Sequence, residues 1–381
     1  MAISSHVISL SGRPFASPSV PRKFHVKPSL YRTTTTNGNV VPSIYISKRT
    51  STESLNLVAK ASADEAGDEI QIKPQQKSMS ILDWLFSFSR PFVIRGTVIG
   101  VAGAVTRVWM ENPNLVQTSN WLQLSSTACL VVIAMVLCDG FVNQTNNISD
   151  IEIDRVNKPY LPLPSGAISL NTAWAMVAGA AATSIGIAAF LKSQAFLISV
   201  LLQLVFGIIY SIPPFYAKRN TYGAVLTIAT MRGFVFSFLM CAGATATLGL
   251  PFQLSPPIVF LSIFTTVYGL AIGIMKDIPD IKGDTIHKVP TLAATYGAKF
   301  AADSSLGFIF LSYMGAIAAG FLYPQMFNQS VMVSTHLAIM LWFAFQAWKL
   351  NNENYNKEAS KSFYLMMWDV LSLECLIFPF I

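Results

Sequence analysis

The chain has 381 residues, of which 52% are hydrophobic and 12% are charged, and its formal net charge is +7. Because about a quarter of the residues of an ordinary globular domain are charged, this composition excludes a typical water-soluble protein. It is instead typical of a protein whose helices lie mostly in a lipid bilayer.

The beginning of the chain differs in composition from the rest. Residues 1–50 contain fourteen Ser or Thr and seven Lys or Arg, and the first acidic residue is Glu53. A basic, acid-free leader without a continuous apolar core is typical of an organelle transit peptide, and its many Ser and Thr residues favour the chloroplast. We therefore expect a plastid transit peptide over 1–62 and a disordered stromal linker over 63–89. The alternative for the leader is a disordered basic tail.

Nine apolar stretches follow, each near the 20 residues that a helix needs to cross a bilayer. The connections between them are short, so residues 90–381 are predicted to form one transmembrane domain. The predicted fold class is therefore an all-α polytopic membrane protein. The expected spans are 91–110, 120–142, 169–191, 194–213, 224–243, 257–275, 303–326, 332–348 and 363–381.

The distribution of basic residues indicates how these spans are oriented. The connections after the second, fourth, sixth and eighth spans share one side of the membrane and carry eleven Lys or Arg residues. The connections on the opposite side carry Lys192. By the positive-inside rule, the four basic connections are predicted to face the stroma.

Two acidic stretches lie on that predicted stromal side, NNISDIEID at 146–154 and KDIPDIKGD at 276–284. From residue 80 onward the chain has fourteen acidic residues, and six of them fall in these two stretches. Scattered surface charge would not concentrate in this way, so the two stretches are predicted to act together. Glu152 alternates with the aspartates of the first stretch and is expected to face away from them.

Within each stretch the aspartates are spaced so that they share one face of a helix. Asp150 and Asp154 are four residues apart, and Asp277, Asp280 and Asp284 follow at intervals of three and four. Five converging carboxylates repel one another unless cations neutralise them. Mg²⁺ prefers oxygen ligands and is usually held by a few carboxylates together with substrate phosphate. We therefore interpret the five aspartates as metal ligands and catalytic residues.

Basic residues on the same side would complete a site for a diphosphate. Lys218 and Arg219 follow the fourth span, and Lys276 opens the second acidic stretch. Arg232 lies in the middle of the fifth span, where an ionisable side chain is costly and usually functional. Metal ions bridge the oxygens of a diphosphate, and cations stabilise its departure.

Other interpretations stay open from these residues alone. Either acidic stretch, taken singly, is equally consistent with a solvated loop, and Lys218 with Arg219 fits membrane anchoring slightly better than substrate binding. A transporter would use Arg232 and the acidic loops as an ion path. Acids gathered at one membrane face fit a diphosphate site better than such a path.

Both acidic stretches resemble motifs of one family. NNISDIEID is similar to the NQxxDxxxD motif, and KDIPDIKGD to the KD(I/L)xDxEGD motif, of plant plastid UbiA-type aromatic prenyltransferases. VNKPYLPLPSG at 156–166 is similar to a further signature of the homogentisate prenyltransferase group, and RPFVIRGT, ATMRGF and LGLPFQ extend the similarity along the chain. Within this group the chain looks most similar to the homogentisate solanesyltransferases of plastoquinone biosynthesis.

The resemblance implies a UbiA-type bundle of about nine transmembrane helices with a central cavity. It implies Mg²⁺-dependent transfer of a prenyl group from a prenyl diphosphate to a ring carbon of a phenolic acceptor, in contact with membrane lipid and with no nucleic-acid partner. The aspartates of each stretch would hold one Mg²⁺, joined in the first stretch by Asn146. The residues expected to bind substrate are Asn146, Asn147, Arg155, Lys158, Tyr210, Lys218, Arg219, Arg232 and Lys276.

Three residues depart from the pattern of that group: Asn147 stands in place of Gln, Lys282 in place of an acid and Phe92 in place of His. They lie at the edge of the expected site, whereas all five aspartates are present. The acceptor is therefore expected to be homogentisate or a specialised phenolic such as a flavonoid, a coumarin or a phenylpropanoid. The chain length of the donor stays open.

An allylic cation formed from the donor would need aromatic faces around it. Four aromatic residues lie in or just after the fourth and sixth spans, close to the charged residues: Tyr210, Phe215, Tyr216 and Tyr268. Aromatic side chains in membrane spans more often pack between helices than contact a cation, so packing is the favoured interpretation for these four.

Overall fold

The computed structural model describes residues 31–36, 39–44 and 90–381, and the chain divides into two units, Met1–Gln75 and Gln76–Ile381. In the first unit, β1 (Tyr31–Thr36) pairs antiparallel with β2 (Asn39–Ile44). The rest of the expected transit peptide over 1–62 and the expected linker over 63–89 lie outside the described residues.

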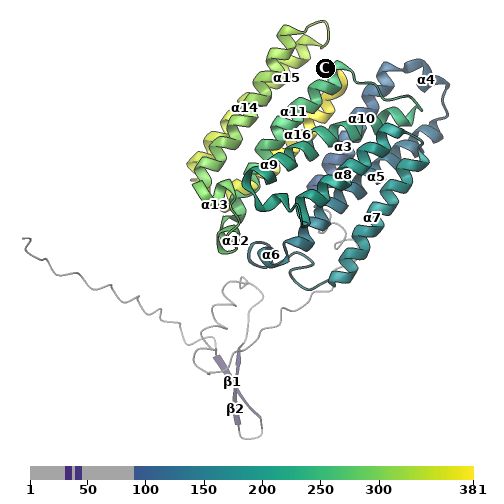
Figure 1. Cartoon of the computed structure of the whole chain (residues 1–381). Helices are drawn as coiled ribbons and strands as arrows, with labels where there is room; N and C mark the ends of the chain where they lie inside the picture. The colour runs from purple at the N-terminus through teal and green to yellow at the C-terminus, as the bar shows by residue number, and fades with distance from the viewer. Residues whose placement is uncertain (1–30, 37–38, 45–89) are drawn as a thin grey trace, which may run out of the picture. The chain divides into compact units, whose positions relative to one another are not determined.

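Residues 90–381 form the predicted all-α bundle, and within this range nine helical segments are long and apolar enough to cross a membrane. Figure 1 shows them packed side by side, with α14 and α15 along one flank and α5 and α7 along the other. The spanning helices are α3 (Pro91–Glu111), α5 (Trp121–Ser149), α7 (Leu170–Phe190), α8 (Gln194–Ser211), α9 (Thr221–Ala229) continued by α10 (Phe236–Thr247), α11 (Pro256–Met275), α14 (Ala298–Leu322), α15 (Gln329–Asn352) and α16 (Lys357–Ile377). The short helices are α4 (Pro113–Thr118), α6 (Ile151–Asn157), α12 (Ile281–Ile286) and α13 (Leu292–Tyr296).

Side-chain caps fix where several of these helices begin. The Ser169 hydroxyl accepts a hydrogen bond from the backbone N–H of Thr172 at the start of α7. The Asn220 side chain accepts one from the backbone N–H of Gly223 at the start of α9. These bonds satisfy N–H groups that have no partner inside the helix, so the polar residue between two apolar spans sets the boundary.

The seventh predicted span is displaced relative to its helix. The apolar run predicts residues 303–326, whereas α14 covers Ala298–Leu322. Proline disfavours a helical conformation of the residue before it, and Pro324 follows Tyr323, the residue that caps α14. The helix therefore ends before the apolar run does.

Between α9 and α10 the chain forms a π-helical turn, Thr230–Val235. This turn packs closely on α11, because a Cβ atom at Gly233 would lie 2.3 Å from Cα of Thr266. Small residues permit such close approach of helices in a membrane. By contrast, a Cβ atom at Gly186 on α7 would have nothing within 4 Å.

We expect Gly233→Ala to lower the free energy of unfolding by about 2 kcal/mol, because the added methyl group pushes two backbones apart. The same substitution at Gly186 should be neutral or slightly stabilising, since alanine favours the helix and meets no atom. Apparent melting temperatures of the two variants in detergent would show the difference. Equal melting temperatures would contradict the close contact at Gly233.

A buried polar cluster joins three helices in the C-terminal part of the bundle. The Tyr313 hydroxyl on α14 donates a hydrogen bond of 2.9 Å to Glu374 on α16, and Nε2 of His336 on α15 lies 3.3 Å from the same carboxylate. The other ring nitrogen of His336 lies 2.6 Å from the carbonyl oxygen of Met332. Nearby, Tyr268 is fully buried and its hydroxyl donates to a backbone carbonyl of α16, so it packs between helices.

The two predicted acidic stretches come together at one end of the bundle. Figure 1 shows α6 and α12, which carry them, at the same end, and the two short helices are in contact. Asn157 of α6 links them directly: its Nδ2 donates to the carbonyl oxygen of Asp280, and its Oδ1 accepts from the backbone N–H of Gly283. This end of the bundle is therefore built by segments about 120 residues apart in sequence.

Candidate active site

A cavity of about 730 Å³ opens between α5, α6, α8, α11, α12 and α16 at the end where the acidic stretches meet. Its lining includes all five predicted aspartates. The prediction that the aspartates of each stretch lie on one helix is wrong. Asp277, Asp280 and Asp284 are divided between the turn after α11, a 3₁₀ turn (Ile278–Asp280) and α12. In the first stretch α5 ends at Ser149 and α6 begins at Ile151, so Asp150 and Asp154 do not share one continuous helix. The Asp150 N–H is shared between two carbonyl groups, as is common where a helix ends, and both aspartates still face the cavity.

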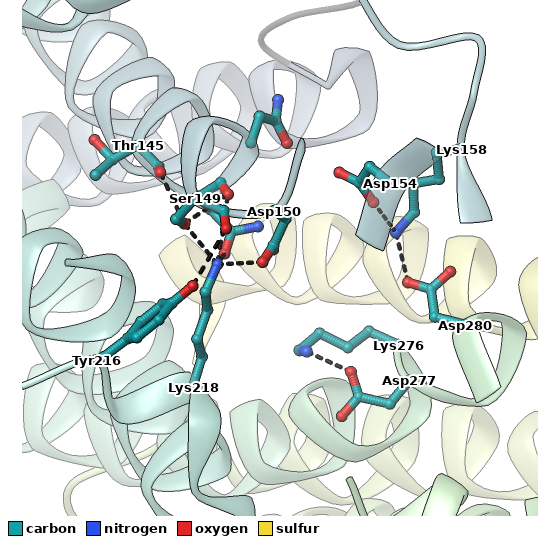
Figure 2. A network of polar contacts seen from close by, with 12 residues as sticks. Thr145, Ser149, Asp150, Asp154, Lys158, Tyr216, Lys218, Lys276, Asp277 and Asp280 are labelled. Atoms are coloured by element: carbon teal, nitrogen blue, oxygen red, sulfur yellow. Dashed lines mark hydrogen bonds and ion pairs between the residues drawn. The ribbon is translucent and has the colours of Figure 1, made fainter. Parts of the chain in front are cut away.

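Lys218 is the centre of a polar cluster on the side of the cavity formed by α5. Its Nζ lies 2.5 Å from Asp150, 2.6 Å from the Ser149 hydroxyl and 3.1 Å from Oδ1 of Asn146 (Figure 2). The ring of Tyr216 lies below the same ammonium group, 5.4 Å from it. Lys218 is therefore held in place, pointing toward the first acidic stretch.

A second lysine joins the two stretches to each other. Nζ of Lys158 lies 2.5 Å from Asp280 and 3.4 Å from Asp154, so one ammonium group faces a carboxylate from each stretch (Figure 2). Nζ of Lys276 lies 2.5 Å from the neighbouring carboxylate of Asp277. Three lysines thus compensate four of the five aspartates.

Burial shifts the proton affinity of these groups. It raises the pKa of the Asp154 carboxyl, against the opposing effect of Lys158. Burial also opposes the charge of Lys158, yet the pKa of Lys158 is raised because Asp280 and Asp154 face it. For Lys218 burial outweighs Asp150 and lowers the pKa. Each group therefore relies on its partner to stay charged in a poorly hydrated place.

Arg232 lies deeper in the bundle and is paired as well. Its guanidinium group binds Asp139 of α5, which is 1% exposed and also accepts a hydrogen bond from Thr97 of α3. The guanidinium carbon lies 5.8 Å from the ring centre of Trp368. The cost of an ionisable group in the membrane is thus met by a partner in another helix.

The structure brings twelve of the fourteen predicted site residues to the cavity and leaves two away from it. Asn147 is buried against α3, where its side-chain oxygen accepts a hydrogen bond from Arg90. Arg155 is exposed and forms an ion pair with Glu152. Glu152 is also exposed, but it borders the cavity, so the expectation that it faces away from the site is wrong. The twelve that line the cavity are Asn146, Asp150, Asp154, Lys158, Tyr210, Lys218, Arg219, Arg232, Lys276, Asp277, Asp280 and Asp284.

Several residues at the cavity were not predicted from the sequence, His287 and Lys288 among them, and five others bear on its chemistry. Arg90, Asn143, Tyr364 and Trp368 line it, and Asp139 binds Arg232 from behind the wall. Asp139 did carry a signal, because an acid inside one span and a base inside another are expected to pair. The aromatic and amide residues resemble ordinary span residues, so no pattern distinguished them.

The carboxylate oxygens that line the cavity suit Mg²⁺, although in this structure most of them face the ammonium groups of lysine side chains. Among the described residues no three acidic or histidine side chains converge in a way that could hold a metal ion alone. Mg²⁺ does not need such a cage, because one or two carboxylates together with phosphate oxygens and water are its usual ligands. Lys158 already places one cation between Asp154 and Asp280, so a cation fits between the two stretches.

Comparison with known proteins agrees with the fold and the motifs. The UbiA prenyltransferase family matches residues 104–369. Probable homogentisate phytyltransferase 2, chloroplastic, of Oryza sativa subsp. japonica is 39% identical over 309 residues, which cover 81% of this chain and 80% of that protein. Homogentisate solanesyltransferase, chloroplastic, of Arabidopsis thaliana is 36% identical over 294 residues, which cover 77% of this chain and 75% of that protein.

A solved structure has the same fold. A UbiA homolog from Archaeoglobus fulgidus, bound to GPP and Mg²⁺, superimposes with a TM-score of 0.58 at 16% identity and covers 77% of this chain and 97% of its own. At that identity the likeness concerns the fold alone. The family match over most of the chain and the two relatives show that the chain belongs to the UbiA prenyltransferase family and is an enzyme that transfers prenyl groups.

Proposed function

We propose that the chain transfers a prenyl group from a prenyl diphosphate to a ring carbon of a phenolic acceptor in an Mg²⁺-dependent reaction. The observation that carries this proposal is the cavity itself, in which two acidic stretches face each other and share Lys158 as a partner. Carboxylates for metal ions and ammonium groups for phosphate oxygens lie together at one end of an apolar bundle. A diphosphate needs this combination of charges.

The lysines and aspartates would divide the work at the diphosphate. The five aspartates would hold Mg²⁺, which draws charge from the diphosphate and makes it a better leaving group. Lys218, Lys158 and Lys276 would turn their ammonium groups from the carboxylates to the phosphate oxygens. Once these donors bind the phosphate oxygens, little further reorganisation is needed when negative charge develops on the leaving group.

The bond changes follow from the two substrates. The carbon–oxygen bond between the prenyl group and the diphosphate breaks, and both electrons leave with the diphosphate. The allylic carbon then forms a bond with an electron-rich ring carbon of the phenol, which afterwards loses its proton. Tyr210 and Tyr216 line the cavity, Tyr216 beside Lys218 and Tyr210 beside Lys276, and their faces would stabilise the developing cation.

The names of the relatives support a narrower assignment. Both are chloroplastic enzymes named for homogentisate, with a phytyl and a solanesyl donor respectively. We propose a chloroplast membrane enzyme whose cavity opens to the stroma and whose acceptor is homogentisate or a related specialised phenolic. Solanesyl transfer to homogentisate in plastoquinone biosynthesis is the alternative within the same class.

A transporter is the alternative from another class, and two features speak against it. Arg232 is neutralised by Asp139, so it offers no free charge to a passing ion. The short helices α6 and α12 lie at one end of the bundle, and the five aspartates line the cavity there instead of a path through the middle. Family membership points the same way, since the family is one of enzymes.

An assay of microsomes prepared from cells that express the full chain would test the proposal. Homogentisate and a panel of plant phenolics would be offered with dimethylallyl, geranyl, farnesyl, geranylgeranyl, phytyl and solanesyl diphosphates, and the products identified by mass spectrometry. We expect a ring-prenylated phenol with Mg²⁺ and at least a 100-fold loss of product when EDTA removes the metal. Absence of product with every pair of substrates, from correctly inserted protein, would contradict the proposal.

A further inference from the structure

The deep end of the cavity differs in chemistry from the layer of lysines and aspartates. We call this end the floor and define it by Asn143, Arg232, Tyr364 and Trp368. Asn143 precedes Ser149, the last residue of α5, by six residues, which places it about 9 Å further along the helix axis into the bundle. The side chains around the floor are mostly apolar, so polar groups here are shielded from water.

Two hydrogen-bond donors at the floor lack partners. Nδ2 of Asn143 and Nε1 of Trp368 are fully buried, and neither has a hydrogen-bond partner within the described part of the chain. Asn143 is 5% exposed and Trp368 is 8% exposed. A buried donor without a partner is costly and uncommon, because on folding it loses its hydrogen bond to water and forms no other. Since both residues line the cavity, an entering oxygen atom could supply the missing bonds after a small rotation of each side chain.

The floor carries no spare charge. Arg232 is the cation here, and Asp139 already binds it, with Thr97 on the second oxygen of that carboxylate. A carboxylate arriving at the floor would leave an uncompensated negative charge inside the membrane. The chemical group that reaches the floor is therefore an uncharged one.

Aromatic rings border the floor on the side of α16. The ring centres of Phe92 and Trp368 are 5.5 Å apart, and those of Phe92 and Tyr364 are 5.9 Å apart with the planes near perpendicular. Phe92 holds the two cavity-lining rings from behind. Such a wall favours a flat aromatic ligand by stacking and edge contacts.

We infer that the floor is the binding site of the aromatic acceptor. An uncharged ring lies against Trp368 and Tyr364, and its phenolic or keto oxygen atoms accept hydrogen bonds from Asn143 and Trp368. Any carboxylate of the acceptor points toward the lysines at the mouth. This inference rests on the proposed function for the identity of the ligand as acceptor, and on the two orphaned donors for the location.

A kinetic experiment separates the acceptor site from the diphosphate site. Asn143→Leu removes one donor, and Trp368→Phe removes the other while it keeps an aromatic ring. With a phenol that the wild-type protein prenylates, each variant should raise the KM for the phenol about tenfold, the effect of a lost hydrogen bond, and leave the KM for the prenyl diphosphate within about twofold. An unchanged KM for the phenol, or equal changes of both KM values, would overturn the inference.

Gln203 provides a matched control. It is a fully buried amide on α8 whose side-chain nitrogen and oxygen both lack partners among the described residues, and it is not part of the cavity lining. Gln203→Leu should therefore leave both KM values near those of the wild-type protein. If it raised the KM for the phenol as Asn143→Leu does, the effect would be a general one of losing a buried amide.

A binding measurement tests whether a phenol binds at the floor independently of prenyl transfer. Methylhydroquinone has the ring and hydroxyl groups of homogentisate but no carboxylate, and it should raise the apparent melting temperature of the wild-type protein and of Gln203→Leu. Asn143→Leu should lose most of that rise. If methylhydroquinone binds through Asn143 but no phenol is prenylated, the proposed function fails and the floor stands as a phenol site. If phenols are prenylated and the rise is the same in all three proteins, the floor inference fails alone.

Discussion

Replacing Asp154 by asparagine is expected to lower the rate of prenyl transfer about 100-fold or more. Asparagine has nearly the same size, so the packing of α6 is kept while the negative charge is lost. The Asp154 carboxylate is buried and faces Lys158, which links it to Asp280 of the second acidic stretch. Losing one preorganised charge at the place where a diphosphate departs typically costs two to three orders of magnitude. Initial rates in microsomes, divided by the amount of inserted protein, would measure it.

Glu152 offers a control in the same short helix. It lies two residues before Asp154 and borders the cavity, but its side chain is 68% exposed and pairs with Arg155 at 2.8 Å. Exposed ion pairs contribute little, so Glu152→Gln should keep the rate within about twofold. Equal losses in both variants would mean that the negative charge of the whole segment matters, and the specific role of Asp154 would be refuted.

Replacing Glu374 by leucine is expected to destabilise the bundle by about 3 kcal/mol without touching the cavity. The Glu374 carboxylate accepts a hydrogen bond from Tyr313 and lies 3.3 Å from His336, all three side chains being buried. Removing one member of a buried pair leaves the other without compensation. The apparent melting temperature in detergent should fall by several degrees, while the rate per folded molecule stays unchanged.

The double variant Glu374→Leu with His336→Leu tests the reason for that loss. If the cost arises from the unpaired imidazole group, removing it as well should restore part of the lost stability. A double variant less stable than Glu374→Leu would show instead that the two sites lose packing independently.

The number and order of the membrane spans were predictable from the sequence. A run of about 20 apolar residues is stable mainly as a helix that crosses a bilayer. All nine predicted spans correspond to helices. The ends were less predictable. α16 begins at Lys357 and not at residue 363, and α15 continues to Asn352 and not to 348. Polar turns at helix ends do not appear in an apolar run, so hydropathy misses them.

Most of the charged residues that line the cavity were also predictable, because charges are rare in this chain and cluster in two stretches. Their pairing was not. Lys158 was expected only to bind substrate, but it bridges Asp154 and Asp280, and the latter lies 122 residues away in sequence. That contact exists only because α6 and α12 pack together, which is a tertiary property. Asp139 escaped notice because it lies inside an apolar run.

The length of α5 affects how a substrate would be found. With 29 residues this helix is about 43 Å long, whereas the hydrocarbon part of a bilayer is about 30 Å thick. The end of α5 that carries the cluster of Lys218 and Asp150 can therefore reach the level of the lipid headgroups. A prenyl diphosphate in the same leaflet holds its diphosphate at that level and its tail among the lipids. The search for it is then a two-dimensional diffusion, so the rate should follow the number of donor molecules per lipid, and adding empty lipid should slow the enzyme at constant total donor.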